Sequence, residues 1–511
     1  MDQLAQSFFL IADWGVLFAV SGGLVVGILI GAIPGLNVPL AIAVAVPLTF
    51  RMDTLPALGF LIGIYKGGTY GGSVSAILIN TPGAPAAAAT TLDGYPLAKA
   101  GKAGKALKMA VYSSVLGETA SDLVLITVAV PIAWFALQFG PPEYFTVTCL
   151  SLTILGIVTG DWVRKGLISG LAGLFLSLIG TDEMTGGTRF TFGSYELSGG
   201  LTFVAMVIGI FAVAEVLHQL GEPTGGEEGG KPVLEVSPDP ADQRVSWAEF
   251  KGCWREILQA TGIGCFIGAL PGLGSAIAAF VSYGTAKSRA KNPEEFGKGS
   301  LKGIAASETA NNAVTGTTLV PLLTLGIPGD VIVAIMLGAF IIHDLVPGPM
   351  LFKEKGLLIT AFFGMLLLSD GLHLLIALVG MPLWMRIIRV SRRVLLPIVM
   401  VLCVVGAYVL SSSIFDIWVT LAFGVLGYLM RKFGYPAAPL LIGFILGPLL
   451  ETNLRQALVI SAGDFSIFVA RPLSLTFLVL SVAAIVYIVR LQRRLQAQRR
   501  GAGGAALNSH P

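Results

Sequence analysis

Long apolar stretches separated by short polar or basic segments run from one end of the sequence to the other. They include 201–217, 357–368, 394–410 and 473–489, and the shorter ones extend into polar flanks. About 20 apolar residues in a helix span the hydrocarbon core of a bilayer. The pattern therefore predicts an all-α polytopic membrane protein with roughly 11–14 membrane segments.

One apolar motif occurs twice along the chain. GILIGAIPGLN covers 27–37 and GCFIGALPGLG covers 264–274, and each is followed by a second Pro-Gly pair, at Pro82-Gly83 and Pro328-Gly329. Because proline lacks an N–H and glycine is flexible, each pair should interrupt a helix. Broken apolar segments at matching positions of two halves are the sequence pattern of a secondary transporter's binding site. The chain is thus expected to hold two repeats with broken helices or re-entrant hairpins.

The basic residues suggest how these repeats are oriented. The loop after the first motif (49–56) holds one Arg and one Asp, whereas its counterpart (287–302) is strongly basic. The order reverses after the second Pro-Gly pairs, where four lysines follow Pro82-Gly83 but 346–356 holds two lysines and one glutamate. Since Lys and Arg collect in cytoplasmic loops, this swap predicts inverted-topology repeats. Assigning all the basic clusters of the chain to the cytoplasm, including the tail at 490–500, predicts a cytoplasmic C-terminus.

Composition and polarity divide the chain into four parts. Of its 511 residues 54% are hydrophobic and only 12% are charged, whereas soluble domains carry about 25% charged residues. The predicted parts are a first repeat half (1–220), a polar cytoplasmic linker (221–255), a second half (256–490) and a basic cytoplasmic tail (491–511). Broken segments are expected at 27–37 and 65–85 in the first half and at 264–274 and 307–330 in the second. The first residues lack the features of a cleaved signal peptide.

The helix breaks and their polar neighbours are the candidate site. The N–H groups at a half-helix start attract anions, and free carbonyls at a half-helix end suit sodium. The predicted substrate- or ion-binding residues are Pro34, Gly35, Asn37, Lys66, Ser73, Ser75, Asn80, Thr81, Pro82, Gly83, Pro271, Gly272, Gly274, Ser275, Asn311, Asn312, Thr315, Thr317, Pro328, Gly329 and Asp330. A sodium ion is expected near Asn311, Asn312 and Thr315. Asn37 corresponds to Gly274, so the two motifs need not contribute equally.

Ionisable residues inside apolar segments are further candidates, because a charge in lipid is costly. Lys66 is either a fixed positive charge for an anion or a side chain that reaches the membrane surface. Glu118 and Asp122, one helical turn apart, and the similarly placed Asp370 and His373 either relay protons or hold helices together. Glu308 and Asp330 are either site groups or helix caps.

No enzymatic motif is found in the sequence. It contains no Walker loop, HExxH or GxSxG, and its four cysteines form no CxxC or cysteine-histidine metal spacing. Neither a cofactor nor a nucleic-acid partner is expected. Transport would then be driven by an ion gradient, of sodium or protons, or by a separate subunit.

The chain resembles the large membrane subunit of the bacterial tripartite tricarboxylate transporters, the TctA family. The resemblance rests on the paired PGL motifs, on YGGSVSAILINTPG (70–83) and on SETANNAVTG…LVPLLTLGIPG (307–329), and it covers nearly the whole chain. It implies a multi-pass protein of the bacterial inner membrane that imports citrate or related carboxylates with sodium or protons. It also implies a periplasmic solute-binding protein and a small four-helix membrane subunit as partners, and leaves a homo-oligomer open.

Inverted repeats, together with analogy, further suggest an elevator-like movement of the two half-helix hairpins. An anion channel-like pore and a non-transporting membrane scaffold are the alternative interpretations.

Overall fold

The computed structural model describes residues 2–33, 35–158, 163–182, 184–221, 237–387, 392–486 and 490. The chain forms two compact units. Unit 1 comprises Met1–Leu137 and Leu201–Leu429, and unit 2 comprises Gln138–Gly200 and Met430–Pro511. Each unit is built from segments of both sequence halves, so neither unit corresponds to one of the halves.

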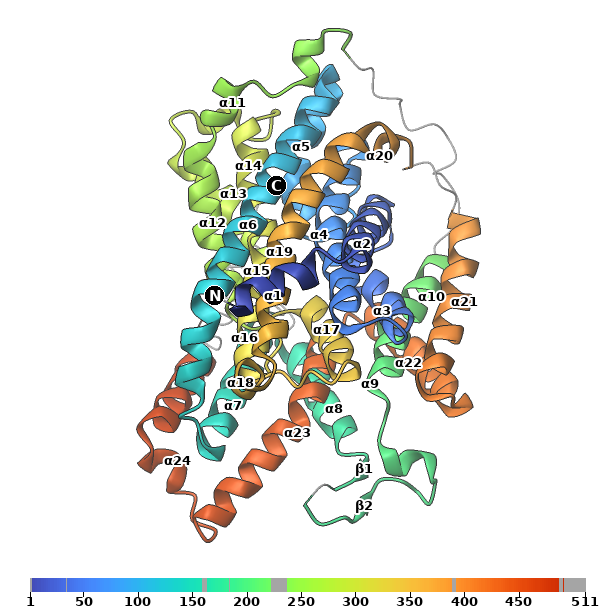
Figure 1. Ribbon diagram of the computed structural model, residues 1–511, viewed down its shortest axis with the longest axis vertical. Coiled ribbons are helices and arrows are strands. Elements are labelled where there is room, and N and C mark those ends of the chain that lie inside the picture. The colour runs from blue at the N-terminus through green and yellow to red at the C-terminus, as the bar shows by residue number, and fades with distance from the viewer. Residues whose placement is uncertain are drawn as a thin grey trace, which may run out of the picture. The chain divides into compact units, whose positions relative to one another are not determined.

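Unit 1 contains both copies of the repeated motif (Figure 1). Its first-half helices are α1 (Asp2–Ile11), α2 (Trp14–Ala32), α3 (Val38–Thr49), α4 (Thr54–Ile79), α5 (Ala87–Leu97), the π-helical turn η1 (Ala98–Lys102) and α6 (Ala103–Ala136). A helix then runs from Phe203 to Gly221 as α9 (Phe203–Val207), η4 (Ile208–Val213) and α10 (Ala214–Gly221). The second-half elements are η5 (Pro240–Gln243), α11 (Trp247–Lys251), α12 (Trp254–Gly268), α13 (Gly274–Arg289), η6 (Pro293–Glu295), α14 (Leu301–Asn312), α15 (Val314–Thr317), α16 (Leu319–Leu325), α17 (Val331–Ile342), α18 (Pro349–Glu354), α19 (Gly356–Val379), α20 (Met381–Ile387), α21 (Arg392–Ser411) and α22 (Ile414–Lys432).

Unit 2 is smaller and also mainly helical. It holds α7 (Pro141–Val158), α8 (Val163–Ser177), η3 (Glu196–Gly199), α23 (Ala437–Ile460), α24 (Ile467–Ala470) and a last apolar helix, Pro472–Val486. An antiparallel pair of two-residue strands, β1 (Gly180–Thr181) and β2 (Thr188–Arg189), follows α8. Within this unit α23 packs against α7 and α8.

The helices have the length and composition that a bilayer requires. Within the described residues, six are long and apolar enough to span a membrane: Trp14–Ala32, Ala87–Ala136, Phe203–Gly221, Gly356–Val379, Ile414–Lys432 and Ala437–Ile460. Four shorter apolar helices, of 10–17 residues, are Val38–Thr49, Val331–Ile342, Leu396–Val409 and Pro472–Val486. The predicted all-α polytopic membrane fold is confirmed.

Helices are interrupted at all four Pro-Gly positions. The chain leaves α2 after Ala32 and enters α3 at Val38, and it leaves α12 after Gly268 and enters α13 at Gly274. The second break of each half separates α4 from α5 and α16 from α17. In the first half the helix continues unbroken through Tyr65 and ends only at Ile79, so the break there is shorter than the expected 65–85.

The same close helix packing occurs once in each half (Figure 1). In the first half Gly27 of α2 lies against α4, where an added Cβ would sit 2.6 Å from the Ile64 carbonyl oxygen. In the second, Gly264 of α12 lies against α14, where a Cβ would sit 2.7 Å from the Ala310 oxygen. Gly31 and Gly268, one turn on, similarly face Gly68 and Val314. Small residues at these repeat-related positions let the helix backbones touch.

This packing predicts a sharp difference between neighbouring glycines. Gly27→Ala should loosen α2 from α4 and lower stability by about 1–3 kcal/mol, because the methyl group has no space. Gly22→Ala on the same helix meets no atom within 4 Å and should be neutral or slightly stabilising. Thermal unfolding of the purified variants measures this, and Gly264→Ala with Gly262→Ala is the matched pair in α12. Equal unfolding temperatures within a pair would contradict the packing.

Part of the expected linker is folded. Ser246 and Glu249 form a capping box at the start of α11, and Gln243 binds the start of α6 by accepting from the Gly104 N–H at 2.9 Å. Lys102–Asp242 (3.0 Å) and Lys105–Glu249 (2.7 Å) join the same two segments. The lysines that follow the second break therefore hold 237–251 in place. The residues of the linker between Gly221 and Ser237 lie outside the described residues.

A carboxylate anchors the β1–β2 hairpin to α23 within unit 2. Asp182 accepts hydrogen bonds from the Arg455 guanidinium (2.8 Å), the Met184 N–H (2.9 Å), the Thr185 hydroxyl (2.8 Å) and Arg189. These donors, with Arg455 foremost, hold the pKa of Asp182 well below its ordinary value of 3.8. Arg189 and Arg455 also pair with Glu451 of α23, at 2.7 and 2.8 Å.

The low pKa of Asp182 fixes the pH window of this anchor. The stabilisation is complete above the ordinary aspartate pKa and is lost only as the pH falls below it towards the lower folded value. Asp182→Asn should therefore speed hydrogen exchange of 180–200 at both pH 7 and pH 5, whereas the native segment keeps the same protection at both. Asp53→Asn, whose carboxylate caps no N–H, is the control. Unchanged exchange in Asp182→Asn would overturn the anchor.

Candidate functional site

A backbone hydrogen bond holds the second break of each half in place. The N–H of Gly272, in the first break of the second half, donates to the carbonyl of Gly329 in the second break at 2.7 Å. In the first half the Gly83 N–H donates to the Gly72 carbonyl at 3.1 Å. Gly35 and Gly272 have φ of 90° and 89°, in the left-handed region that suits glycine. The two motifs thus turn the chain in the same way.

Two of the four half-helix starts are closed by their own side chains. Asn37 Oδ1 accepts from the Leu40 N–H at 2.9 Å and caps α3, and Asp330 Oδ1 accepts from the Val333 N–H at 2.8 Å and caps α17. The Tyr65 hydroxyl of α4 donates to the other Asp330 oxygen at 2.8 Å. A capping oxygen occupies the position that an anion would take, so α3 and α17 are poor anion sites.

The other two half-helix starts have no side-chain cap and lie next to each other. Neither α5 nor α13 begins with a capping side chain. Ala86 and Ala89 at the start of α5 pack against Ala276 and Ala279 of α13. Ser275, in the first turn of α13, is only half-buried. The two uncapped helix starts, one from each half of the chain, therefore meet at a place lined by small side chains.

Lys66 is buried and fully paired. Its ammonium donates to Asp122 of α6 at 2.6 Å, to Asp370 of α19 at 2.5 Å and to the Leu366 carbonyl at 3.0 Å. The three N–H groups of a lysine are all used in these bonds. Only 1% of the side chain is exposed, so it does not reach a membrane surface. Its charge is neutralised by two aspartates rather than presented to an anion.

A second buried pair lies close to Lys66. His373 Nδ1 of α19 is 2.9 Å from Glu118 Oε2 of α6, and the Tyr70 ring packs edge-on against the imidazole at 5.5 Å. The other imidazole nitrogen and Glu118 Oε1 are buried with no partner. Lys66 joins α4 to α6 and α19, and the His373–Glu118 pair joins α19 to α6, which is the helix-holding role expected as one alternative for these residues. The proton-relay alternative stays a prediction.

Glu308 is the centre of a third polar group. Its carboxylate accepts from the Ser73 hydroxyl of α4 at 2.6 Å, from the Ser114 hydroxyl of α6 at 3.0 Å and from the Thr90 hydroxyl of α5. Asn312 Nδ2 donates to Ser114 Oγ at 2.8 Å. All five side chains are buried. Glu308 lies within α14 and caps no helix start, unlike Asp330.

The remaining predicted residues have different surroundings. Ser75, Thr81, Thr315 and Thr317 donate to nearby backbone carbonyls, as Ser and Thr hydroxyls often do in and beside helices. Asn80 ends α4 in the left-handed conformation, with φ 55°. Asn311 is buried with both amide atoms unpartnered. Pro82, Pro271, Gly274 and Pro328 lie in or beside the breaks, and Pro34 lies outside the described residues.

Several residues of the site were not singled out from the sequence. Thr90 and Ser114 bind Glu308, and the Ser121 hydroxyl accepts from the Thr317 N–H at 2.9 Å. Ser114 lies four residues before Glu118, on the same helix face, which is the signal that could have identified it. The position of Thr90, on the helix after the second break, is a weaker signal.

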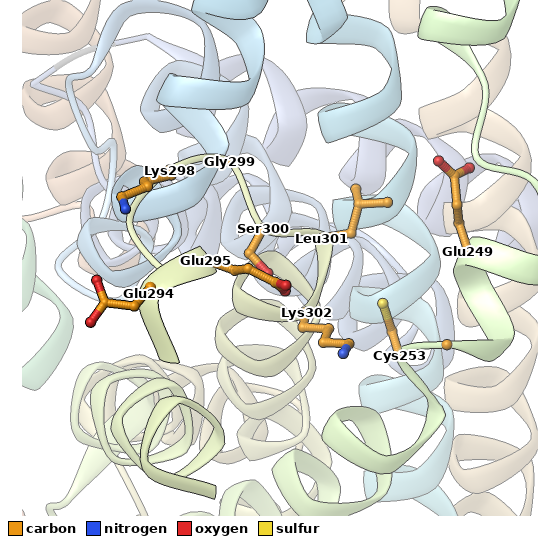
Figure 2. Close-up of a pocket in the computed structure, with 10 residues that line it drawn as sticks. Glu249, Cys253, Glu294, Glu295, Lys298, Gly299, Ser300, Leu301 and Lys302 are labelled. Carbon is orange, nitrogen blue, oxygen red and sulfur yellow. The ribbon is translucent and has the colours of Figure 1, made fainter. Parts of the chain in front are cut away.

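A cavity of about 660 Å³ lies away from these groups (Figure 2). Its lining includes the acidic Glu249, Glu294 and Glu295 and the basic Lys298 and Lys302, on α11 and the segment that leads into α14. Figure 2 shows both signs of charge facing the same space. None of the predicted site residues lines it, and its mixed charge favours no anion, so the candidate site stays at the helix breaks.

Paired broken helices around a buried polar centre define a polytopic membrane protein of the transporter class. The chain belongs to the tripartite tricarboxylate transporter TctA family, whose model matches residues 17–442. It is therefore the membrane subunit of such a transporter, and the family is one of transport components rather than enzymes.

Two proteins of Agrobacterium vitis are similar to this chain. One, an uncharacterized 52.8 kDa protein in the TAR-I ttuC′ 3′ region, is 38% identical over 464 residues, which are 91% of each chain. The other, an uncharacterized protein in the TAR-II ttuC′ 3′ region, is 37% identical over 223 residues, 44% of this chain and 92% of that protein. No solved structure matches the chain.

Proposed function

We propose that the chain is the large subunit of an ion-coupled importer of citrate or related carboxylates. A periplasmic solute-binding protein would deliver the substrate, and a small four-helix subunit would complete the assembly in the bacterial inner membrane. The C-terminus would lie in the cytoplasm, and sodium or protons would supply the driving force. The observation that carries the proposal is the pair of uncapped half-helix starts, of α5 and α13, that meet in unit 1.

An anionic substrate needs a positive partner at this place. Lys66 does not supply it, because two aspartates already neutralise it. A half-helix start supplies it from the backbone, through the aligned peptide dipoles and free N–H groups. The first turn of α13, with Ser275 and Ala276, is only partly buried and can offer its backbone to a carboxylate, whereas Ala86 and Ala89 of α5 are buried against it. We infer that one substrate carboxylate binds at α13 near Ser275 and that the start of α5 adds to the same field.

We propose an elevator-like movement, which the broken helices in both halves support. Repeats of opposite orientation would let the hairpins α2–α3 and α12–α13 exchange access between the two membrane surfaces while the substrate stays bound. An elevator-like displacement of these hairpins against the remaining helices fits this arrangement. In this movement α4 and α14 would travel with the hairpins, because glycine contacts hold α2 against α4 and α12 against α14.

Uptake in cells tests the importer against the channel-like alternative. Cells that express the chain with its two partners should accumulate labelled citrate, or another di- or tricarboxylate or aromatic carboxylate, above the outside concentration. Accumulation should require the binding protein and should stop when ionophores dissipate the sodium and proton gradients. Uptake that only equilibrates and does not respond to ionophores would favour the channel, and no uptake of any carboxylate would refute the proposal.

A further inference from the structure

The carboxylate of Glu308 is surrounded by oxygen atoms but lacks a counter-charge. Its side chain is completely buried, and it accepts hydrogen bonds from three hydroxyl groups, of Ser73, Thr90 and Ser114. No Lys, Arg or His among the described residues forms an ion pair with it, since Lys66 is committed to Asp122 and Asp370 and His373 to Glu118. A buried charge that is hydrogen-bonded but unpaired is costly in a membrane, and this cost marks functional sites.

A second observation points to a ligand at the same place. Asn312 is buried, and its Nδ2 donates to Ser114 Oγ at 2.8 Å and to the Glu308 carbonyl at 3.0 Å. Its Oδ1, on the same amide, is buried and has no partner. A buried carbonyl oxygen of this kind is rarely left without a hydrogen bond or an ion. It adds an unused acceptor to the oxygens around Glu308.

We propose that Glu308, Ser73, Thr90, Ser114 and Asn312 form a binding site for one sodium ion. The role of this ion as the coupling ion rests on the proposed function. The ligands would be the Glu308 carboxylate, the hydroxyl oxygens and Asn312 Oδ1. A hydroxyl has one hydrogen and two lone pairs, so each can keep its bond to Glu308 and still offer a lone pair to a cation. Carboxylate, hydroxyl and amide oxygens are the ligands that hard cations prefer.

The position of this group explains how a cation could act on the substrate. Its members come from α4, α5 and α6 of the first half and from α14 of the second. Thr90 lies one turn into α5, whose start is one of the two proposed anion-binding starts. A cation at Glu308 would hold α5 against α14 and would add positive charge behind that start. Sodium and carboxylate would then strengthen each other's binding, which is the reciprocity that coupling requires.

Sodium binding to the purified full-length chain tests the site without any transport. We expect saturable binding of radiolabelled sodium, and thermal stabilisation by sodium chloride but not by potassium or choline chloride at equal ionic strength. Glu308→Gln should weaken sodium binding by at least roughly tenfold, since it removes the only charged ligand. Thr90→Val should weaken it several-fold, whereas Thr90→Ser, which keeps the hydroxyl, should restore most of it. Glu143→Gln, a buried carboxylate of unit 2 that pairs with Arg471, is the control and should bind sodium normally.

The outcomes separate this inference from the proposed function. No sodium binding by the native chain, or equal loss in Glu308→Gln and Glu143→Gln, would overturn the site. Carboxylate uptake that persists without sodium and follows the proton gradient would overturn it too, and would leave the importer intact. Sodium binding at Glu308 in a protein that accumulates no carboxylate would instead refute the proposed function. If Glu308→Gln does not yield folded protein, the Thr90→Val and Thr90→Ser pair decides.

Discussion

Lys66→Met should greatly lower the yield of folded protein. The substitution leaves the carboxylates of Asp122 and Asp370 buried without a counter-charge, where the lysine ammonium had been 2.6 and 2.5 Å away. Removing one partner of a buried ion pair costs about 3–5 kcal/mol, a large share of the stability of most proteins. We expect little monodisperse protein after extraction in mild detergent, and a clearly lower unfolding temperature for what remains.

Two further variants separate charge from packing at Lys66. Lys66→Met combined with Asp122→Asn and Asp370→Asn removes all three charges and should recover much of the lost protein, because no buried charge is then unpaired. Lys353→Met alters an exposed lysine and should behave as the native chain. A single Lys66→Met variant as stable as the native protein would show that the two aspartates are not held by this lysine.

Ser275→Asp should strongly weaken carboxylate binding while leaving the fold intact. An aspartate in the first turn of α13 stabilises the helix, because its charge complements the helix dipole. The added carboxylate occupies the position proposed for the substrate carboxylate and repels that group. Two like charges about 4 Å apart repel by several kcal/mol near a protein surface. We expect uptake to lose affinity at least about tenfold, which corresponds to roughly 1.4 kcal/mol.

Ser275→Asn is the matched control for this variant. Asparagine has nearly the size of aspartate and no charge, so its KM should stay close to the native value. Competition between labelled and unlabelled carboxylate in uptake measures both variants, and detergent-extracted yield checks that both fold. Equal affinity in Ser275→Asp and Ser275→Asn would show that the substrate carboxylate does not bind at the start of α13.

The positions of the helix breaks could be predicted from the sequence because Pro-Gly pairs act locally. Proline removes a backbone donor and glycine adopts φ values near 90°, as Gly35 and Gly272 do, whatever packs around them. The membrane fold could be predicted equally well, since the long apolar stretches dictate it. How far helix α4 continues was harder to predict, because its run of glycines is held helical by close packing against α2.

The partners of the buried charges could not be predicted, because they come from helices far apart in the chain. Lys66 meets Asp122 and Asp370 only once α4, α6 and α19 are packed together. Glu308 meets Ser73 and Thr90, which lie 235 and 218 residues away along the chain. Sequence spacing identifies residues that share a helix face, such as Glu118 and Asp122, but not which helix faces them. For this reason the role of Lys66 stayed open between two alternatives, neither of which describes its pairing with two aspartates.

Reconstitution into proteoliposomes tests the central claim most directly. Vesicles that contain the chain and its small membrane subunit, with the substrate-loaded binding protein outside, should accumulate labelled carboxylate when an inward sodium gradient is imposed. Accumulation should collapse when sodium is equal on both sides, and Glu308→Gln vesicles should show none. Equilibration of the carboxylate without accumulation, whatever the ion gradients, would contradict the account and would identify a pore instead.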